Sequence, residues 1–379
     1  MNVLLTCGGT AGHINPALAV ARRLKNDDPN TGILFVGAEG GMETRLVPRE
    51  GWDLKTVPIS SFRRSFSREG IAHNRKTLRE LRTALRLAGQ IINEFRPDVI
   101  LGTGGYASFP ALRQGQKKKI PTLVHEANAV PGLTTKMVSR RADRVLVNYE
   151  ECAGAYRHPE RVIVTGMPVK EEFFSLSHEQ TRRGLGLDET PFVLSAFGSL
   201  GARDMNHRMT EFIRLESDLE PFVHVHAAGS SGWEWLPEEI ASAGVRLELH
   251  PSIRVLEYLY NMPELMTAAD LMICRAGAST LSELTAAGLP AIIVPSPNVT
   301  NNHQEKNARL LEKRGGAIVL TEAECSGSGL FDLCVELLSD PKRLAAMSEA
   351  QRAAAVPDAL ERICALVREL GGADGPSAA

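Results

Sequence analysis

The sequence lacks several features that would each assign it to a broad class of protein. It has no apolar run approaching the roughly 20 residues needed to span a bilayer, so any membrane contact is expected to be peripheral. A formal net charge of −2 leaves no basic excess, which argues against nucleic acid as a partner. The six cysteines include no Cys-x-x-Cys pair, and no apolar signal segment follows a basic start, so we expect a reduced, cytoplasmic protein.

Length and composition predict a folded protein of two domains. A single core rarely extends beyond about 250–300 residues. This chain has 379 residues, and its hydrophobic content of 43% is sufficient for compact folding.

Apolar runs alternate with helical stretches in both halves, which predicts two doubly wound α/β domains with parallel sheets. The expected strands are residues 3–5, 33–36, 98–102, 121–125 and 144–147 in the first half, and 192–196, 223–226, 245–249, 271–273 and 291–294 in the second. His224, His226 and His250 lie along these strands without cysteine or carboxylate spacing, so we expect structural roles rather than metal binding.

The segment 270–307 contains a strand, a loop, a helix, a second strand and a second loop, which together predict a βαβ unit. In parallel sheets, ligands bind beyond the carboxyl ends of the strands, where both loops lie. The helix expected from Ala278 to Gly288 directs free N–H groups and a partial positive charge at such a ligand, which favours a phosphate.

Polar side chains in this unit suit a nucleotide sugar. Glu283 lies about one turn into the helix, where its carboxylate could accept hydrogen bonds from both hydroxyl groups of a sugar diol. Residues 301–304 are neutral hydrogen-bonding residues in the second loop. An ordinary explanation is also open, in which Ser279 and Thr280 only cap the helix and Glu283 is solvated.

Two further glycine loops follow expected strands. Residues 7–13, C-G-G-T-A-G-H, match neither the dinucleotide G-x-G-x-x-G nor a P-loop, so NAD is a poor interpretation. A lone histidine such as His13 at a helix start is more often structural than catalytic. Residues 197–201, F-G-S-L-G, favour a phosphate cradle made of backbone N–H groups and the Ser199 hydroxyl, with a plain turn as the alternative.

The run R-A-G-A-S-T-L-S-E at residues 275–283, followed by N-N-H-Q-E-K-N-A at 301–308, resembles the donor site of the MurG family. These bacterial enzymes transfer N-acetylglucosamine to undecaprenyl-pyrophosphoryl-N-acetylmuramyl-pentapeptide. The resemblance covers nearly the whole chain and implies the GT-B architecture, in which two doubly wound Rossmann-like domains face a central cleft. It also implies a role in peptidoglycan synthesis at the cytoplasmic face of the cell membrane, and hence in cell shape and division.

The resemblance also implies a division of labour between the domains. Residues 1–165 would form the N-terminal acceptor and membrane-facing domain, and residues 166–355 the domain that binds the UDP-sugar donor. A helix at 356–370 would pack back on the first domain. Residues 371–379 are small and polar and are expected to be disordered.

By resemblance, the loops of the first domain line the acceptor side of the cleft. The family's G-G-T-G-G-H loop corresponds to residues 8–13, with Ala11 in place of one glycine. Its histidine, here His13, is the proposed general base. The family's G-G-Y loop corresponds to residues 104–106.

Two more motifs depart from the family pattern, one at a single position and the other at two positions. The H-E-Q-N loop is H-E-A-N here, with Ala127 for the usual glutamine, while Asn128, which would reach the donor sugar, is present. The linker G-N-P-V-R is G-M-P-V-K here, with Met167 and Lys170. Lysine keeps the positive charge of arginine but lacks its planar fork, so it would contact a phosphate only as a point charge.

In the second domain the resemblance places Ser199 on the donor diphosphate and Leu259 on the uracil, although Phe197 and Leu200 depart from the pattern G-G-S-Q-G-A. The residues implied to bind substrates are Thr10, Ala11, Gly12, Asn128, Lys170, Ser199, Leu259, Ala278, Ser279, Thr280, Leu281, Ser282, Glu283 and Gln304. Those implied to line the acceptor cleft are Gly104, Gly105, Tyr106 and Glu126.

The implied reaction has UDP-N-acetylglucosamine as donor and the undecaprenyl-linked sugar as acceptor. His13 would take the proton of the acceptor hydroxyl as that oxygen attacks the anomeric carbon with inversion. No Asp-x-Asp lies at an expected strand end, so we expect no cofactor and no tightly bound metal, with helix N-termini and Ser199 stabilising the leaving UDP.

Two other functions are considered. A UDP-N-acetylglucosamine 2-epimerase shares the architecture and the donor, but the T-G-G-Y and H-E-A-N loops speak against it. A non-catalytic subunit that binds a nucleotide sugar is the second alternative. The presence of both halves and of His13 argues against it.

The segment from Arg63 to Arg86 contains eight basic residues and two acidic ones. At about 100° per residue, a helix here would present a basic stripe and an apolar stripe. The basic stripe is Arg75, Arg79, Arg82 and Arg86. The apolar stripe is Leu78, Leu81, Leu85, Ala88 and Ile92. We expect the arginines to bind an anionic lipid surface, the alternative being a core-facing helix with an ordinary solvated face.

Overall fold

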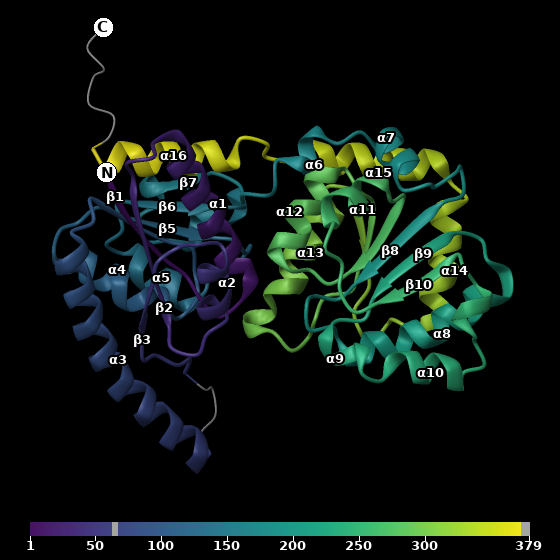
Figure 1. Ribbon diagram of the computed structural model, residues 1–379, viewed down its shortest axis with the longest axis horizontal. Helices are drawn as coiled ribbons and strands as arrows, with labels where there is room; N and C mark the ends of the chain where they lie inside the picture. Colours follow the sequence, from purple (N-terminus) through teal and green to yellow (C-terminus); the bar gives the residue numbers. More distant parts are fainter. Residues whose placement is uncertain (63–66, 373–379) are drawn as a thin grey trace, which may run out of the picture. The chain divides into compact units, whose positions relative to one another are not determined.

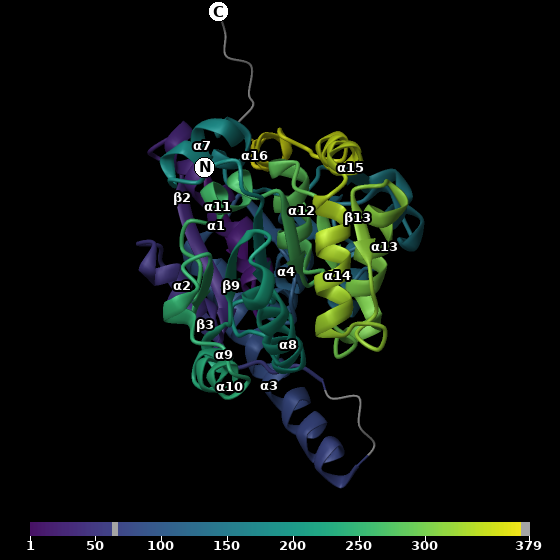
Figure 2. The same ribbon diagram turned by 90° about the vertical axis from the view of Figure 1, so that its right-hand side faces the viewer.

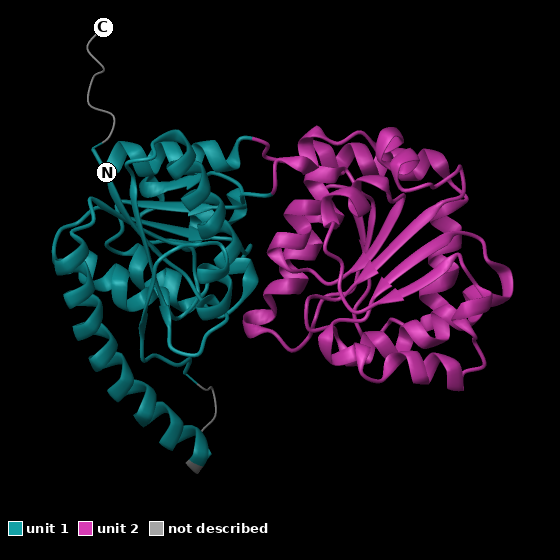
Figure 3. Ribbon diagram, in the orientation of Figure 1, with its two compact units in different colours: residues 1–169, 358–379 teal, residues 170–357 magenta. Residues whose placement is uncertain are grey.

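The computed structural model describes residues 1–62 and 67–372. They form two compact units, shown in Figure 3: unit 1 contains the chain up to Val169 and again from Asp358, and unit 2 contains residues 170–357. Of the tail expected to be disordered, residues 373–379 lie outside the described residues, as do Arg63 and Arg64 of the basic segment.

The first division between the units falls at residue 169 rather than at the expected 165. Hydrogen bonds of Gly166 account for the difference. Its N–H donates to the carbonyl of Val147 at 3.3 Å, and its own carbonyl accepts from Nε2 of His125 at 2.9 Å. These bonds tie the start of the linker to the sheet of unit 1.

Unit 1 contains a seven-stranded parallel sheet in the order β3-β2-β1-β4-β5-β6-β7 (Figure 1). Its strands are β1 (Asn2–Thr6), β2 (Gly32–Ala38), β3 (Leu54–Val57), β4 (Val99–Gly102), β5 (Thr122–Glu126), β6 (Arg144–Val147) and β7 (Val162–Val164). The central strand β1 places Leu4 opposite Leu34 on β2 and Ile100 on β4. These apolar residues are buried, as expected where helices cover both faces of a parallel sheet.

The helices of unit 1 are α1 (Ala11–Asp27), α2 (Glu43–Arg49), α3 (Arg68–Phe95), α4 (Ser108–Lys117), α5 (Leu133–Ser139) and α16 (Ala359–Leu370), with short 3-10 turns at Glu150–Ala155 and Pro159–Arg161. One face of the sheet shares its core with α1, α2 and α16, while α4 contacts both α3 and α5. The C-terminal helix α16 buries Ile363, Cys364 and Val367 in this core, and Arg368 pairs with Asp27 of α1 at 2.7 Å.

The buried face of the long helix α3 includes only part of the apolar stripe that the sequence shows. Figures 1 and 2 show its first turns extending away from the rest of unit 1. Thr77, Ala84, Ala88 and Ile92 are buried, whereas Leu78 is 49% exposed. Leu78 does not face the core, because at this level of α3 the inward side chain is Thr77, which shares a hydrogen bond with Ser60 at 2.8 Å. None of the described helices is both long enough and apolar enough to cross a bilayer.

Unit 2 contains a six-stranded parallel sheet in the order β10-β9-β8-β11-β12-β13. Its strands are β8 (Phe192–Ala196), β9 (Val223–Ala227), β10 (Ile253–Leu256), β11 (Leu271–Cys274), β12 (Ala291–Ile293) and β13 (Ala317–Val319). The strand predicted at residues 245–249 is not formed. That segment turns through a 3-10 helix at Leu247–Leu249, and the next apolar run, Ile253–Leu256, pairs with β9 instead.

The helices of unit 2 are α6 (Glu172–Ser175), α7 (His178–Gly184), α8 (Arg203–Leu219), α9 (Ser230–Trp233), α10 (Leu236–Ser242), α11 (Met262–Ala268), α12 (Ala278–Ala287), α13 (His303–Lys313), α14 (Gly327–Leu338) and α15 (Pro341–Ala353), with a 3-10 turn at Thr300–Asn302. Helices α8, α10 and α14 share the core on one face of the sheet. Helix α12 packs with α6, α11 and α13 on the other (Figure 1). The two units are thus doubly wound, as predicted.

Candidate functional site

His13 lies in the first turn of α1, just after the glycine loop that follows β1. Its Nδ1 lies 3.2 Å from the carbonyl oxygen of Thr103, whose hydroxyl donates to the His13 carbonyl at 2.6 Å. A carbonyl oxygen can only accept, so Nδ1 carries the proton in this contact and Nε2 keeps its lone pair. The contact therefore gives His13 the tautomer that a general base needs.

Two glycines of the loop after β4 make this contact possible. At Gly104, φ is +109° and a Cβ atom would lie 2.6 Å from Nδ1 of His13. At Gly105, φ is +80° and a Cβ atom would collide with the carbonyl of Gly8. The loop at residues 7–13 and the loop after β4 therefore pack directly against each other. Tyr106 follows Gly105 at the same edge of the sheet.

The first turn of α1 accommodates the alanine that departs from the family pattern. Thr10 is the N-cap residue, and its carbonyl accepts from the N–H of His13 at 3.0 Å. Ala11 and Gly12 belong to the helix, and Ala11 does not have a positive φ. No glycine is required at Ala11, so the substitution leaves the loop intact.

Glu43 is a buried carboxylate beneath this loop that no sequence motif indicates. Its Oε1 accepts from the N–H of Ala38 at 2.7 Å and its Oε2 from that of Gly9 at 3.4 Å. Burial and the charge of Glu43 together raise the pKa of Tyr106. A lone glutamate at a helix start is common, and only the fold reveals that Glu43 lies under the glycine loop.

The H-E-A-N motif forms a loop organised by Glu126. This carboxylate is 3% exposed, and its Oε1 accepts from the backbone N–H and the side-chain Nδ2 of Asn128, both at 3.1 Å. Its Oε2 accepts from the N–H of Gly132 at 2.9 Å. Glu126 therefore orients Asn128. Ala127 is buried, and its carbonyl accepts from Asn148 at 3.2 Å.

Unit 2 contains a cavity of about 220 Å³ where the loops after β8, β11 and β12 meet. Its lining comprises residues 196–198, Gly201, Ala202, Arg275, Gly277, Thr280, Ser296 and Gln304. Thr280 lies at the N-terminus of α12, whose first turn directs its free N–H groups away from the helix. Gln304 uses its Oε1 to accept from the N–H of Ser296 at 2.9 Å, which leaves its amide nitrogen to donate. A phosphate group suits these donors.

The other expected donor residues differ in accessibility. Ser199 is exposed in the β8 loop, and Ala278 and Ser282 are half-buried on α12. Leu259 and Leu281 are 5% and 1% exposed, so their side chains belong mainly to the core. The hydroxyl of Ser279 is buried and has no hydrogen-bond partner among the described residues. Glu283 and Lys170 complete the residues expected to bind the donor in unit 2.

Glu283 and Lys170 interact in unit 2. Burial raises the pKa of Glu283 to about 7, and the charge of Lys170 opposes that rise. Burial and the charge of Glu283 in turn raise the pKa of the Cys274 thiol to about 12, so that thiol is neutral. The structure therefore brings together two residues that the sequence places in separate motifs.

Of the residues that line the cavity, only Thr280 and Gln304 belong to the expected substrate-binding set. Arg275 lies outside that set, although an arginine directly after a buried strand is itself a signal for an anion site. Phe197, which departs from the family pattern, also lines the cavity and packs on His226 with ring centroids 5.9 Å apart.

The histidines of the unit 2 strands are part of its core. Ser195 shares hydrogen bonds with His224 at 2.8 Å and His226 at 2.7 Å, and His224 also contacts Glu216 at 2.7 Å. These four residues are buried, which fits a structural role. His250 bonds Glu220 at 2.7 Å near the surface.

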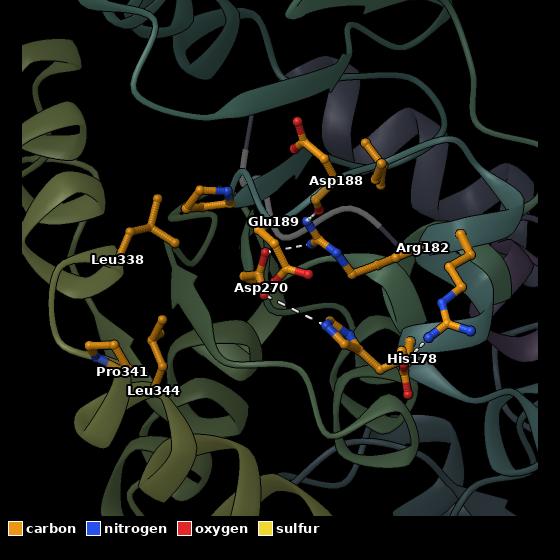
Figure 4. Close-up of a pocket in the computed structure, with 12 residues that line it drawn as sticks. His178, Arg182, Asp188, Glu189, Asp270, Leu338, Pro341 and Leu344 are labelled. Carbon is orange, nitrogen blue, oxygen red and sulfur yellow. Dashed lines mark hydrogen bonds and ion pairs between the residues drawn. The ribbon is translucent and has the colours of Figure 1, made fainter.

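Figure 4 shows a second cavity of unit 2, of about 360 Å³, at the amino ends of the strands. Asp270, which directly precedes β11, accepts from Arg182 at 2.8 Å. Nη1 of Arg182 also donates to the carbonyl of Ala268, and Nη2 donates to those of Asp188 and Thr190, so both terminal nitrogens of the guanidinium are engaged. None of the expected site residues lines this cavity. The Asp270 carboxylate accepts from Arg182 and from the N–H of Phe192, so it connects the starts of β11 and β8.

Comparisons with known proteins identify the family of both units. The family model "Glycosyltransferase family 28 N-terminal domain" matches residues 3–147, and "Glycosyltransferase family 28 C-terminal domain" matches residues 192–363. Two curated relatives carry the name UDP-N-acetylglucosamine--N-acetylmuramyl-(pentapeptide) pyrophosphoryl-undecaprenol N-acetylglucosamine transferase. The one from Acetivibrio thermocellus is 39% identical, covering 98% of both chains, and the one from Halalkalibacterium halodurans is 40% identical, covering 98% of this chain and 99% of its own.

Solved structures agree as well. The crystal structure of MurG from Acinetobacter baumannii superposes with a TM-score of 0.75 and 26% identity, covering 97% of this chain and 99% of that one. A putative UDP-N-acetylglucosamine 2-epimerase from Listeria monocytogenes has a TM-score of 0.67 at 15% identity, covering 97% and 96%, and so shares the fold alone. The predicted GT-B fold class and the family resemblance are confirmed. The chain belongs to glycosyltransferase family 28, within the MurG family of N-acetylglucosamine transferases.

Proposed function

We propose that this protein transfers N-acetylglucosamine from UDP-N-acetylglucosamine to the 4-hydroxyl of N-acetylmuramic acid in undecaprenyl-pyrophosphoryl-MurNAc-pentapeptide, forming lipid II for peptidoglycan. The names of the relatives support this donor and acceptor. The observation that carries the chemistry is the 3.2 Å contact between His13 Nδ1 and the Thr103 carbonyl, because it favours the tautomer with the proton on Nδ1 and the lone pair on Nε2, the atom proposed to accept the acceptor proton.

In the proposed reaction, the acceptor hydroxyl oxygen bonds to the anomeric carbon while the bond from that carbon to the UDP oxygen breaks. The hydroxyl proton passes to Nε2 of His13. Attack from the face opposite UDP inverts the configuration. General-base assistance of this kind contributes about 10²- to 10⁴-fold to the rate.

Unit 2 would hold the donor. The cavity beside Thr280 and Gln304 suits the diphosphate, and Glu283 on the second turn of α12 suits the ribose diol. We propose that the N–H groups at the start of α12, the β8 loop and Ser199 stabilise the charge that develops on UDP, with no metal required. Turnover that persists in excess chelator is the outcome this proposal requires, and loss of turnover that Mg²⁺ restores contradicts it.

We further propose that α3 places unit 1 on an anionic lipid surface. Arg75, Arg79, Arg82 and Arg86 are all exposed, and none has an ion-pair partner among the described residues. Leu78, 49% exposed, lies one turn from Arg75 and Arg82. Each basic residue near such a surface contributes about 1 kcal/mol, so four could hold the protein at the cell membrane without insertion.

One assay separates the three functions considered. UDP release is measured from UDP-N-acetylglucosamine with and without a short-chain analogue of the lipid-linked acceptor. Release only with the analogue supports transfer. Formation of the 2-epimer would indicate the epimerase, and neither product would indicate a binding subunit.

A further inference from the structure

A largely buried carboxylate stands next to the donor cavity without belonging to any motif. Glu322 follows β13, and its side chain is 12% exposed. Its Oε2 lies 2.8 Å from Nη1 of Arg275, whose side chain is 11% exposed and lines the cavity. The cation at the cavity wall therefore has a negative charge directly against it.

This contact is an ion pair without a directed hydrogen bond. Nη1 of Arg275 carries two protons, and it donates to the carbonyls of Val294 at 3.0 Å and Pro295 at 3.1 Å. Oε2 of Glu322 accepts no hydrogen bond from any described residue. The desolvation cost of a buried ion pair can equal its Coulombic gain when hydrogen bonds do not satisfy the remaining lone pairs, so this pair adds little net stability to the fold. Stability of unit 2 is therefore a poor explanation for a glutamate at this position.

The backbone that carries Glu322 is fixed from the opposite side by Arg208 of α8. Its Nη2 donates to the carbonyl of Glu322 at 2.8 Å, and its Nε donates to that of Cys325 at 2.6 Å. Its Nη1 donates to the carbonyl of Asp204, also at 2.8 Å. The backbone at Glu322 is thus held by Arg208, independently of the contact between the carboxylate and Arg275.

The rest of the Arg275 guanidinium is available to a ligand. Its Nε and Nη2 have no hydrogen-bond partner in the part of the chain that the structure describes. A phosphate group in the cavity would meet these donors and would also experience the charge of Glu322. Because the site is largely buried, that repulsion is weakly screened.

We propose that Glu322 weakens the hold of Arg275 on the diphosphate, so that UDP dissociates after transfer. This inference rests on the proposed function, because it takes the cavity as the diphosphate site. Glu322 acts through Arg275 and is a positioning residue rather than a catalytic one. Arg275 can then orient the diphosphate through its planar fork without retaining the product.

The test compares the affinity and dissociation rate of UDP for the wild-type chain and for Glu322→Gln, by calorimetry and stopped-flow kinetics. Glu324→Gln is the matched control, because Glu324 lies in the same loop but is exposed and accepts from Thr321 at 2.7 Å. Removing the negative charge should tighten UDP binding by about tenfold and slow its dissociation. The control should behave like the wild type.

A residue that only supports the loop would give the opposite result. Folded Glu322→Gln protein that binds UDP with equal or lower affinity overturns the proposal. Glu322→Met is measured in parallel, because methionine removes the charge without burying an amide. Equal or lower affinity for UDP in either folded variant overturns the proposal. Wild-type protein that fails to bind UDP removes the donor-site assignment itself, whereas normal wild-type binding with an unchanged variant removes only this inference.

Discussion

The charge of Lys170 holds down the pKa of Glu283, which burial raises to about 7. Lys170 is the first residue of unit 2, and Glu283 lies on the second turn of α12. The carboxylate is therefore ionised above about pH 7 and protonated below it. Only the ionised form has both oxygens available to accept hydrogen bonds from the two ribose hydroxyls.

Affinity for UDP-N-acetylglucosamine should consequently rise as the pH increases from about 6 to about 8, because Glu283 loses its proton in that interval. Calorimetry across this pH range measures the effect, and Glu283→Gln should abolish the pH dependence. Glu283→Ala should raise the donor KM about ten- to a hundredfold, the value of a hydrogen bond to a charged group. A donor KM that does not change would remove Glu283 from the site.

Lys170→Ala should move the pH dependence of donor binding to higher pH, because the loss of the opposing charge lets the pKa of Glu283 rise further. Lys170→Arg keeps the charge, and its planar fork should give equal or tighter binding of UDP. Calorimetry with both variants is the measurement. If Lys170→Ala leaves both the affinity and its pH midpoint as in the wild type, Lys170 does not act on the donor site.

Local patterns predict the strands of this protein well where an apolar run is bounded by turn residues. The strands at 144–147 and 192–196 have the predicted limits. The prediction fails at 245–249, since V-R-L-E-L and the following I-R-V-L-E both begin with an apolar, a charged and an apolar residue. Only pairing with β9 selects the second run, and pairing partners are not visible in local sequence.

In the candidate site, too, local features are predictable from the sequence and long-range contacts are not. Glycine loops after strands, and a helix N-terminus after β11, are local features, and they place His13 and α12 correctly in their elements. The charge partners are not local. Glu43 lies under a loop that is far from it in sequence. Glu322 pairs with Arg275 although the chain between them forms both β12 and β13. Such contacts depend on the order of the strands in the sheet.

Gly104→Ala should lower kcat while leaving the affinity for UDP unchanged, because a Cβ atom at Gly104 would displace the His13 ring in unit 1. The matched control is Gly40→Ala. Gly40 also has a positive φ, of +69°, but a Cβ atom there would meet nothing within 4 Å. Steady-state kinetics on both variants separate the collision from the backbone strain. Equal losses in the two variants would show that strain alone is responsible.

Changing Arg75, Arg79, Arg82 and Arg86 together to glutamine should abolish co-sedimentation with anionic vesicles and leave turnover on a water-soluble acceptor analogue intact. Binding by the wild type should also weaken steeply as salt is added. The matched control changes four exposed arginines of unit 2, namely Arg183, Arg214, Arg246 and Arg254. Unchanged sedimentation of the α3 variant would mean that its arginines are merely solvated.

In the proposed reaction, unit 2 binds the donor while His13 of unit 1 takes the acceptor proton. These roles are separated by measuring His13→Ala in the acceptor-dependent assay of UDP release, together with calorimetry of donor binding. We expect kcat to fall about 10²- to 10⁴-fold while the dissociation constant for UDP-N-acetylglucosamine stays at its wild-type value. An unchanged kcat, or a loss confined to KM, would contradict these roles.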